Sequence, residues 1–243
     1  MTLDGTNTWV LRAEPGGAAL VIDPGPLDPG HLDAVAEAAG DVRAVLLTHG
    51  HLDHSAGARA FAERVGCGVR ALDPAFWYGE EGLRDGDVVE LDGLVVRVVA
   101  TPGHTADSLS FLVEPDAAVL TGDTVLGRGT TVVAYPDGAL GPYLDSLRRL
   151  RDLAEAHEVH QVWPGHGPAL PAAVPVLEHY LAHRAERLDQ VRAALAAGDA
   201  TPADVVRRVY ADVDPVRWPA AELSVRAQLE YLVGGCDEGD ASP

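Results

Sequence analysis

Four stretches of this sequence share one arrangement, in which an apolar, strand-like run ends in a glycine-containing turn that carries histidine or aspartate. The four turns are THGHLDHSAG (48–57), TPGHT (101–105), TGDT (121–124) and PGHGP (164–168). Glycine lets the backbone approach a cleft closely, and loops held by rigid elements commonly carry binding residues. If these side chains serve one site, the fold has to bring four segments that are far apart in sequence to one point.

The densest turn contains the hexapeptide HGHLDH (49–54), which follows the apolar run VRAVLLT (42–48). Side chains two apart in an extended chain point to the same side. His49 and His51 can therefore reach one ion at the ~2.0–2.1 Å of a zinc–imidazole bond. Asp53 repeats that spacing, whereas His54 points elsewhere. The spacing favours dividing these four ligands between two neighbouring ions.

Three further candidate ligands come from the other turns, and they are His104, Asp123 and His166. With the hexapeptide they give about the ligand number that two zinc ions sharing a hydroxide and a bridging carboxylate require. His179 and His183, four apart on an expected helix, form a zinc-like pair without an evident third ligand. The sequence therefore predicts one dinuclear site that is built from the four turns.

The first 170 residues alternate strand-like and helix-like segments, which predicts an α/β (α+β) domain of sheets covered by helices. Hydrophobic patterns predict strands at 7–13, 18–23, 42–48, 108–114, 117–123 and 159–163, and a hairpin over 87–103. Helical patterns are found at 31–40, 56–66 and 142–156.

The character of the chain changes after Pro171, where three helical patterns follow one another. They cover residues 175–198, 201–213 and 219–235. We therefore expect a catalytic domain at 1–170, a small helical subdomain at 171–235 and a disordered tail at 236–243.

The net charge of −19 argues against a large nucleic-acid interface, because an acidic surface repels polyanions. Segment 175–233 contains seven arginines against nine acidic residues, so the helical subdomain does not supply a basic face. Two distant cysteines, Cys67 and Cys236, exclude a disulfide scaffold. No apolar run is long enough to span a membrane and no signal-peptide pattern is visible, so we expect a cytoplasmic protein.

The ligand pattern His49-x-His51-x-Asp53-His54, followed in order by His104, Asp123 and His166, resembles the metallo-β-lactamase superfamily. The flanking text narrows the resemblance to the β-lactamase-like protein 2 branch. This text comprises GTNTWVL, TPGHTADSLSF, TGDTVLGRGTTVV, YLDSLRRL, VWPGHGP and YLAHRAERLDQV. The resemblance covers most of the chain, including the C-terminal helices.

This resemblance implies an αββα sandwich with a small, winged-helix-like C-terminal unit and two Zn²⁺ ions per chain. Iron and manganese are the alternative metals. Carried over by position, the first ion takes His49, His51 and His104. The second ion takes Asp53, His54 and His166, and Asp123 bridges both.

The expected function is that of a dinuclear-zinc metallohydrolase, in which a hydroxide that bridges the metals attacks an ester or thioester, as in glyoxalase II-like chemistry. Asp53 has a second, catalytic role, because its free oxygen can orient the hydroxide or carry its proton. Arg128, five residues after Asp123, is a candidate contact for a substrate anion.

Two other enzymatic functions stay open. One is a phosphodiesterase or endoribonuclease acting on single-stranded RNA, which the acidic composition disfavours. The other is a mononuclear iron dioxygenase acting on persulfides, which has the same ligand motif. Diiron oxygen reductases replace the second histidine with glutamate, and His51 argues against them.

A non-catalytic role is a further alternative, with the C-terminal helices as the contact for DNA or a partner. Because this unit is acidic, packing or homodimer formation suits it better than DNA binding. Hydrolysis of β-lactams is disfavoured by the missing export signal.

Overall fold

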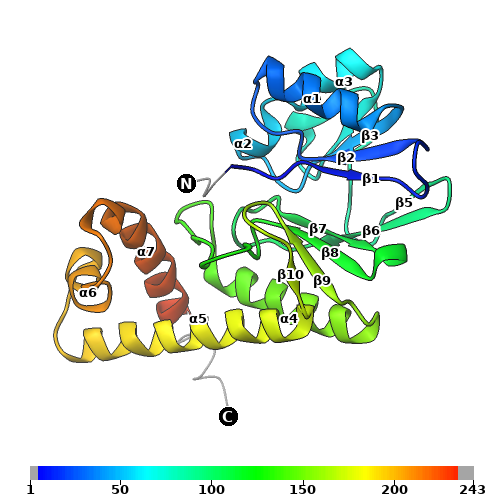
Figure 1. The fold of residues 1–243 in the computed structure, drawn as a ribbon. Helices are drawn as coiled ribbons and strands as arrows, with labels where there is room; N and C mark the ends of the chain where they lie inside the picture. Colours follow the sequence, from blue (N-terminus) through cyan, green and yellow to red (C-terminus); the bar gives the residue numbers. More distant parts are fainter. Residues whose placement is uncertain (1–4, 235–243) are drawn as a thin grey trace, which may run out of the picture.

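Two β-sheets lie face to face between outer helices in the computed structural model, which describes residues 5–234 (Figure 1). The first sheet has the strand order β1-β2-β3-β4, with β2, β3 and β4 parallel and β1 antiparallel at the edge. Its strands are β1 (Trp9–Leu11), β2 (Ala19–Ile22), β3 (Val42–Leu46) and β4 (Gly68–Arg70).

The second sheet has the order β10-β9-β8-β7-β6-β5 and is antiparallel except for the parallel pair of β8 and β9. Its strands are β5 (Val88–Leu91), β6 (Leu94–Ala100), β7 (Leu109–Val113), β8 (Ala118–Gly122), β9 (Gln161–Pro164) and β10 (Leu170–Pro171). The predicted hairpin over 87–103 corresponds to β5 and β6, which turn at Asp92 and Gly93.

Helices cover the outer faces of both sheets. The first sheet carries α1 (Pro29–Ala39), α2 (Leu52–Ser55) and α3 (Ala58–Val65), and the second carries α4 (Leu140–Ala156) and α5 (Ala173–Ala196). Short 3₁₀ turns are η1 (Pro74–Phe76) and η2 (Glu114–Asp116). Helix α1 begins two residues before the predicted position, because Asp28 caps it by accepting from the N–H of His31 and Pro29 occupies the first turn.

Three apolar layers hold the sandwich together, and the predicted fold class is confirmed. The central layer lies between the two sheets, where Leu20 and Leu46 of the first sheet pack with Phe111 of the second. The other layers lie between each sheet and its helices. Nearly continuous burial of β2, β7 and β8 follows from this arrangement, because both faces of these strands are covered.

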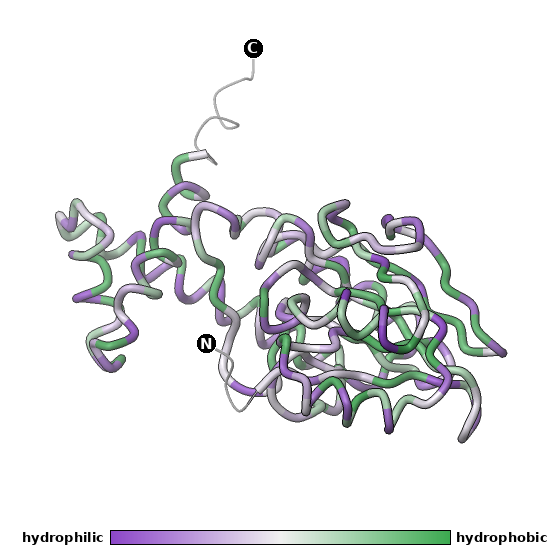
Figure 2. Tube along the Cα trace, turned by 90° about the horizontal axis from the view of Figure 1, so that it is seen from above, coloured by the Kyte–Doolittle hydropathy of each residue, from purple (hydrophilic) through white to green (hydrophobic). Residues whose placement is uncertain are grey.

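The C-terminal helices project from one side of the sandwich (Figures 1 and 2). After α5 come α6 (Pro202–Val209), η3 (Pro215–Arg217) and α7 (Trp218–Gly234). These helices share a small core that includes Val191, Val205 and Val225. Helix α6 ends at Val209, four residues before the predicted end, and its N-terminus has a capping box between Thr201 and Asp204.

Within residues 5–234, every helix is too short or too polar to meet the requirements of a membrane span. The tail predicted to be disordered, 236–243 with Cys236, lies outside the described residues.

Candidate metal centre

The four predicted turns meet at one edge of the sandwich. Asp123 follows β8 and His166 follows β9, and because these strands are parallel, both residues lie at the same end of the second sheet. The N–H of Gly165 donates to the carbonyl oxygen of Gly122 across 2.8 Å and holds the two turns together. The N–H of Leu109 donates to the carbonyl oxygen of Thr48 across 2.7 Å and joins the end of β3 to the second sheet.

The hexapeptide differs from the expected extended chain in its second half. Asp53 and His54 lie in the short helix α2, whereas residues 49–51 precede that helix. The N–H groups of His54 and Ser55 both donate to the carbonyl oxygen of His51, and this closes the helical turn. The expectation that Asp53 simply repeats the extended spacing was therefore wrong, because backbone hydrogen bonding to His51 starts a helix at Leu52.

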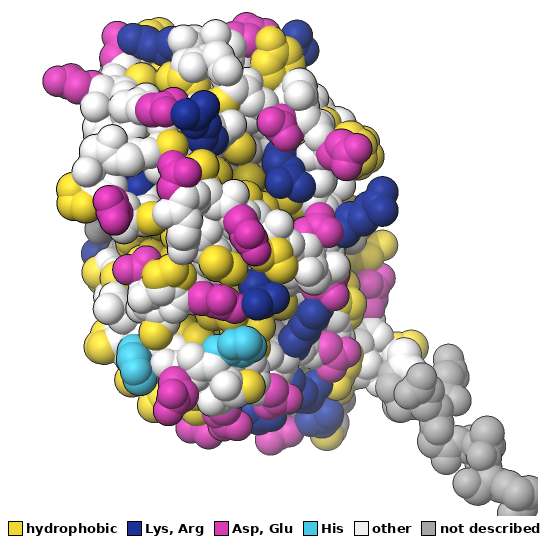
Figure 3. Space-filling view, turned by 90° about the vertical axis from the view of Figure 1, so that its right-hand side faces the viewer, with side chains coloured by type: hydrophobic (Ala, Val, Ile, Leu, Met, Phe, Trp, Pro, Cys, Tyr) yellow, Lys and Arg dark blue, Asp and Glu magenta, His cyan; other side chains and the backbone are white. Residues whose placement is uncertain are grey.

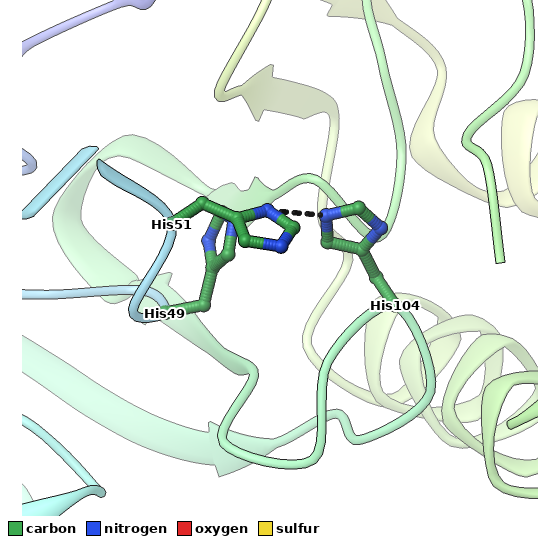
Figure 4. Close-up of side chains that lie close together, drawn as sticks. All are labelled: His49, His51 and His104. Atoms are coloured by element: carbon green, nitrogen blue, oxygen red, sulfur yellow. Dashed lines mark hydrogen bonds between the residues drawn. The ribbon is translucent and has the colours of Figure 1, made fainter. Parts of the chain in front are cut away.

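Ligand-type side chains form three overlapping groups, in each of which one potential ligand atom per residue lies within 4.8 Å of the others. The groups are His49, His51 and His104; His49, His54 and Asp123; and Asp53, His54 and His166. Figure 4 shows the first group, where His51 Nδ1 lies 3.1 Å from His104 Nε2 and 3.0 Å from His49 Nε2. All seven predicted ligands therefore come together.

Asp123 lies between the two outer groups. Its carboxylate oxygens are 3.2 Å from His166 Nε2, 3.5 Å from His54 Nε2 and 3.6 Å from His104 Nε2. The same carboxylate therefore faces histidines of both groups.

The outward nitrogens of three histidines are held by oxygen acceptors. His54 Nδ1 is 2.8 Å from Asp23 Oδ2, His104 Nδ1 is 2.9 Å from the carbonyl oxygen of Val132, and His166 Nδ1 is 2.9 Å from that of Gly5. An oxygen acceptor assigns the proton to Nδ1 and leaves the Nε2 lone pair free for a cation. This arrangement is typical of histidines that bind a metal.

Two of the orienting residues, Asp23 and Thr6, were missed by sequence reasoning. Asp23 is buried and accepts from the N–H and hydroxyl of Thr48 as well as facing His54. Thr6 donates its hydroxyl to Asp53 Oδ2 across 2.9 Å. A signal for Asp23 does exist in the sequence, since it ends an apolar run just as the ligands do, whereas Thr6 has none.

The pKa values of the histidines in this cluster are shifted in different directions. Burial, reinforced by neighbouring imidazoles, holds the pKa of His49 well below its usual value. Burial also lowers the pKa of His104, although Asp123 opposes this effect. At His166 burial opposes protonation, but hydrogen bonds to Asp123 and Asp53 raise the pKa to about 10.

The carboxylates stay ionised. The hydrogen bond from His166 is the main cause that lowers the pKa of Asp53. Burial would raise the pKa of Asp123, but the hydrogen bond from His166 and the nearby charges of His54 and His104 outweigh it. Ionised carboxylates beside imidazoles attract cations strongly. A metal ion bound here would displace the proton of His166 and supply the positive charge in its place.

Two observations test whether a metal ion fits. Asp123 Oδ1 is buried and has no hydrogen-bond partner among residues 5–234, although such an atom normally has one. Gly165 lies against it, because a Cβ at this position would be 2.6 Å from Asp123 Oδ1 and 2.8 Å from His54 Cε1. A glycine that preserves space beside a carboxylate oxygen without a hydrogen bond fits a bound cation.

The candidate ligands differ in their exposure to solvent. His49, His54 and His166 are buried, whereas His51 is exposed and 30% of the Asp53 side chain is accessible. Between them Leu52 is 75% exposed. A substrate can therefore approach across His51, Leu52 and Asp53.

Arg128 lies beside this edge. Its side chain is exposed, and the N–H of the preceding Gly127 donates to the carbonyl oxygen of His166 across 2.8 Å. Its predicted contact with a substrate anion stays a prediction.

Comparisons with known proteins find similarity over almost the whole chain. Residues 1–166 match the metallo-beta-lactamase superfamily, and residues 201–233 match the beta-lactamase associated winged helix domain. A beta-lactamase-like protein 2 homolog from Caenorhabditis elegans is 31% identical over 98% of this chain and 81% of its own length.

Two other proteins extend the comparison. An atrochrysone carboxyl ACP thioesterase from Aspergillus fumigatus is 32% identical over 86% of this chain and 70% of its own length. The crystal structure of a metallo-beta-lactamase family protein from Thermus thermophilus has a TM-score of 0.78 at 23% identity, and the match covers 95% of this chain and 89% of that one. The structural likeness extends through the C-terminal helices.

Proposed function

This chain belongs to the metallo-β-lactamase superfamily, a family of metal-dependent hydrolases, and on that basis we propose that it is a dinuclear metallohydrolase of esters or thioesters. The observation that carries the proposal is the set of three ligand groups that are joined through His49 and His54, with Asp123 in the middle group. Two ions need two groups of ligands and a shared carboxylate, and the cluster offers both.

The ligands are assigned to the two ions as follows. His49, His51 and His104 would hold the first ion, Asp53, His54 and His166 would hold the second, and Asp123 would be shared by both. The distances of Asp123 from His104, His54 and His166 support this division. We propose Zn²⁺ for both positions, because imidazole with carboxylate is a ligand set that suits zinc, and iron or manganese is the alternative.

Divalent ions bound here supply activation of water at neutral pH and polarisation of the substrate carbonyl. The protein's own residues provide orientation. Asp53 is fixed by the hydroxyl of Thr6 and is more accessible than the other ligands of its group, so it faces the substrate side. This position lets its carboxylate orient the attacking water and accept the proton that the water loses.

The Asp53 role is tested with Asp53→Ala. We expect turnover to fall by about 10²-fold or more, since positioned general bases contribute about 10²–10⁴-fold. Metal content is measured on the same samples by elemental analysis. Near-normal metal content together with a near-normal rate would rule the role out.

The substrate class rests on the surroundings of the open side. Leu52 is exposed between two ligands, and the exposed Val132 holds His104 through its backbone, so apolar side chains flank the site. Apolar neighbours suit an acyl chain better than a polyanion. The relative named as an acyl-carrier-protein thioesterase supports the same class. A thiolate also leaves without protonation, so a thioester needs no general acid beyond the site.

The charge distribution supports a small substrate over RNA. The net charge is −19. On the face drawn in Figure 3, dark blue arginine side chains are interspersed with magenta acidic ones. A nucleic-acid interface requires basic side chains concentrated on one face.

The test is a side-by-side assay of purified protein loaded with Zn²⁺, Mn²⁺ or Fe²⁺ on a thioester, a β-lactam, a phosphodiester and single-stranded RNA. We expect two metal ions per chain and the highest kcat/KM on the thioester. One iron per chain with no hydrolysis would instead favour the dioxygenase. If only RNA is cleaved, the proposed ester or thioester substrate is wrong, whereas the assignment as a metallohydrolase stands.

A further inference from the structure

The segment that follows Asp123 and leads to α4, residues 124–139, contacts two candidate ligands at once. Thr131 donates its hydroxyl to the carbonyl oxygen of Asp123. The next residue, Val132, presents its carbonyl oxygen to His104 Nδ1 at 2.9 Å. Any shift of this segment would therefore move the bridging carboxylate and a histidine of the first group together.

Helix α5 holds this segment from the C-terminal side. Tyr180 accepts from the N–H of Leu126 at 2.8 Å, and its hydroxyl is 3.0 Å from the carbonyl oxygen of Gly129. One turn further along α5, Arg184 donates from Nη2 to the carbonyl oxygen of Thr131 at 2.5 Å. The two side chains lie on one helix face because they are four residues apart.

Helix α4 completes the contact through Tyr143. This ring is fully buried and lies 4.9 Å from the Arg184 guanidinium carbon, and its hydroxyl donates to the carbonyl oxygen of Thr124 at 2.8 Å. On the other side Gly103, next to His104, approaches so closely that a Cβ there would lie 2.3 Å from Tyr143 Cα. Arg184 and Tyr143 thus form one packed unit with both ligand-bearing turns.

A charged residue at position 184 needs a specific reason. Arg184 is 5% exposed, and among residues 5–234 it has no carboxylate partner and no partner for Nε. Burying a guanidinium without a counter-charge is costly. Neighbouring positions on the same buried face carry leucine, at Leu177 and Leu188, so space alone would not require arginine.

We propose that Arg184 is a positioning residue for the metal centre, through which helix α5 fixes the segment that orients Asp123 and His104. The guanidinium suits this role because its planar fork donates to Thr131 while it stacks on Tyr143. The C-terminal region then acts on the reaction by setting metal geometry. This inference rests on the proposed metal-dependent function.

The experiment compares Arg184→Met with Arg187→Met in the full chain. Arg187 is a matched control on the same helix, because its guanidinium carbon lies 4.7 Å from the Tyr210 ring and Nη1 donates to a backbone oxygen, that of Val209, at 3.1 Å. Competition with a chromophoric chelator measures Zn²⁺ affinity. The visible spectrum of the Co²⁺-loaded protein reports ligand geometry.

We expect Arg184→Met to weaken Zn²⁺ binding by about 10–100-fold and to change the Co²⁺ spectrum, as loss of an orienting partner does. Arg187→Met should leave both unchanged even if it lowers stability equally. Equal Zn²⁺ affinity and an unchanged spectrum in Arg184→Met would overturn the proposal. Equal losses in the two variants would also overturn it, since they would show a purely structural effect.

Tyr180→Phe serves as the second variant, because it removes one oxygen and retains the buried ring. A loss of Zn²⁺ affinity that is smaller than that of Arg184→Met would support the role of helix α5 in holding segment 124–139. If Arg184→Met does not fold, unchanged affinity in folded Tyr180→Phe overturns the proposal. A wild-type protein that binds no metal would refute the proposed function itself, which is a different result from wild-type binding with unaffected variants.

Discussion

At the scale of single residues, Asp23 is the group that organises the buried half of the site. Its carboxylate faces His54 Nδ1 and accepts both the N–H and the hydroxyl of Thr48. It adopts a left-handed backbone conformation, with φ of 49°, which is unusual for a residue other than glycine. Backbone outliers of this kind cluster at functional sites, and here the strain places the carboxylate between two turns.

Asp23→Ala removes this orienting group. We expect Zn²⁺ affinity to fall by about 10–100-fold, because His54 loses the acceptor that fixes its ring. Chelator competition measures the affinity, and urea denaturation of the metal-free protein measures the separate loss of stability. Asp41→Ala is the control, since Asp41 is exposed and its carboxylate pairs with Arg43 on the surface. Unchanged affinity in a folded Asp23→Ala protein would contradict the assignment.

Gly165 tests the space beside the bridging carboxylate. In Gly165→Ala the new methyl group would lie 2.6 Å from Asp123 Oδ1, so the carboxylate or the turn has to move. We expect a stability loss of about 1–3 kcal/mol from overpacking and weaker binding of Zn²⁺.

The control for this variant is Gly141→Ala. Its added Cβ would meet Tyr231 at 3.5 Å, an ordinary contact, within helix α4. Denaturant titrations and metal analysis of both variants check the prediction. If Gly165→Ala binds two ions as the wild type does, the turn that contains Gly165 does not limit the space of the metal site.

At the scale of elements, the site depends on the edge where β1 of the first sheet meets β9 of the second. Trp9 and Trp163 stack with ring centroids 5.1 Å apart, and the indole N–H of Trp9 donates to the carbonyl oxygen of Pro164 at 3.1 Å. Asn7 donates to the same oxygen and to that of Gly167. The segment that contains Thr6 is thereby fixed to the turn of His166.

Trp9→Phe removes the indole donor and keeps a ring for stacking. We expect a loss of about 0.5–1.5 kcal/mol in the free energy of unfolding, the usual value of one such hydrogen bond. Zn²⁺ affinity should also fall, because the turn of His166 loses a support.

Trp77→Phe is the matched control, since the Trp77 indole donates to the carbonyl oxygen of Ala71 at 2.8 Å, and Ala71 is not one of the candidate ligands. We expect it to lower stability by a similar amount and to leave Zn²⁺ affinity unchanged. Urea denaturation and chelator competition separate the two effects. Indistinguishable affinities of the two variants would show that the β1–β9 edge does not influence the metal centre.

At the scale of the whole molecule, a metal ion would link elements that are otherwise joined mainly by apolar packing. Its ligands come from both sheets, at the ends of β3, β8 and β9 and from the turn between β6 and β7. Without an ion, imidazoles and carboxylates are crowded at one edge in a protein of net charge −19.

The expected homodimer stays a prediction.

Metal removal should therefore lower global stability. A ligand present at 1,000 times its dissociation constant stabilises the folded state by about 4 kcal/mol. We expect thermal midpoints to fall on treatment with a chelator and to recover when Zn²⁺ is added back in stoichiometric excess. The chelator-treated sample has to be shown to be free of metal. If its thermal midpoint then equals that of the Zn²⁺-loaded protein, this cluster holds no ion tightly.

Much of this architecture follows from local patterns in the sequence. The apolar runs that become β3 and β8 are recognisable because these strands are largely buried, and the glycine-containing turns after β3, β8 and β9 mark His49, Asp123 and His166. Element ends were less predictable. Caps such as Asp28 and the backbone bonds to His51 shift them by a few residues.

Residue type and local spacing identify the side chains that can bind a metal, because ligand chemistry belongs to residue type and the close spacing of His49 to His54 is visible along the chain. The contacts that orient these side chains depend on the folded arrangement. Thr6 meets Asp53, Asp23 meets His54, and Arg184 reaches the segment beside Asp123 across separations of 31 residues and more. Such contacts depend on strand order and on how α5 packs against the sandwich, and no local periodicity encodes either.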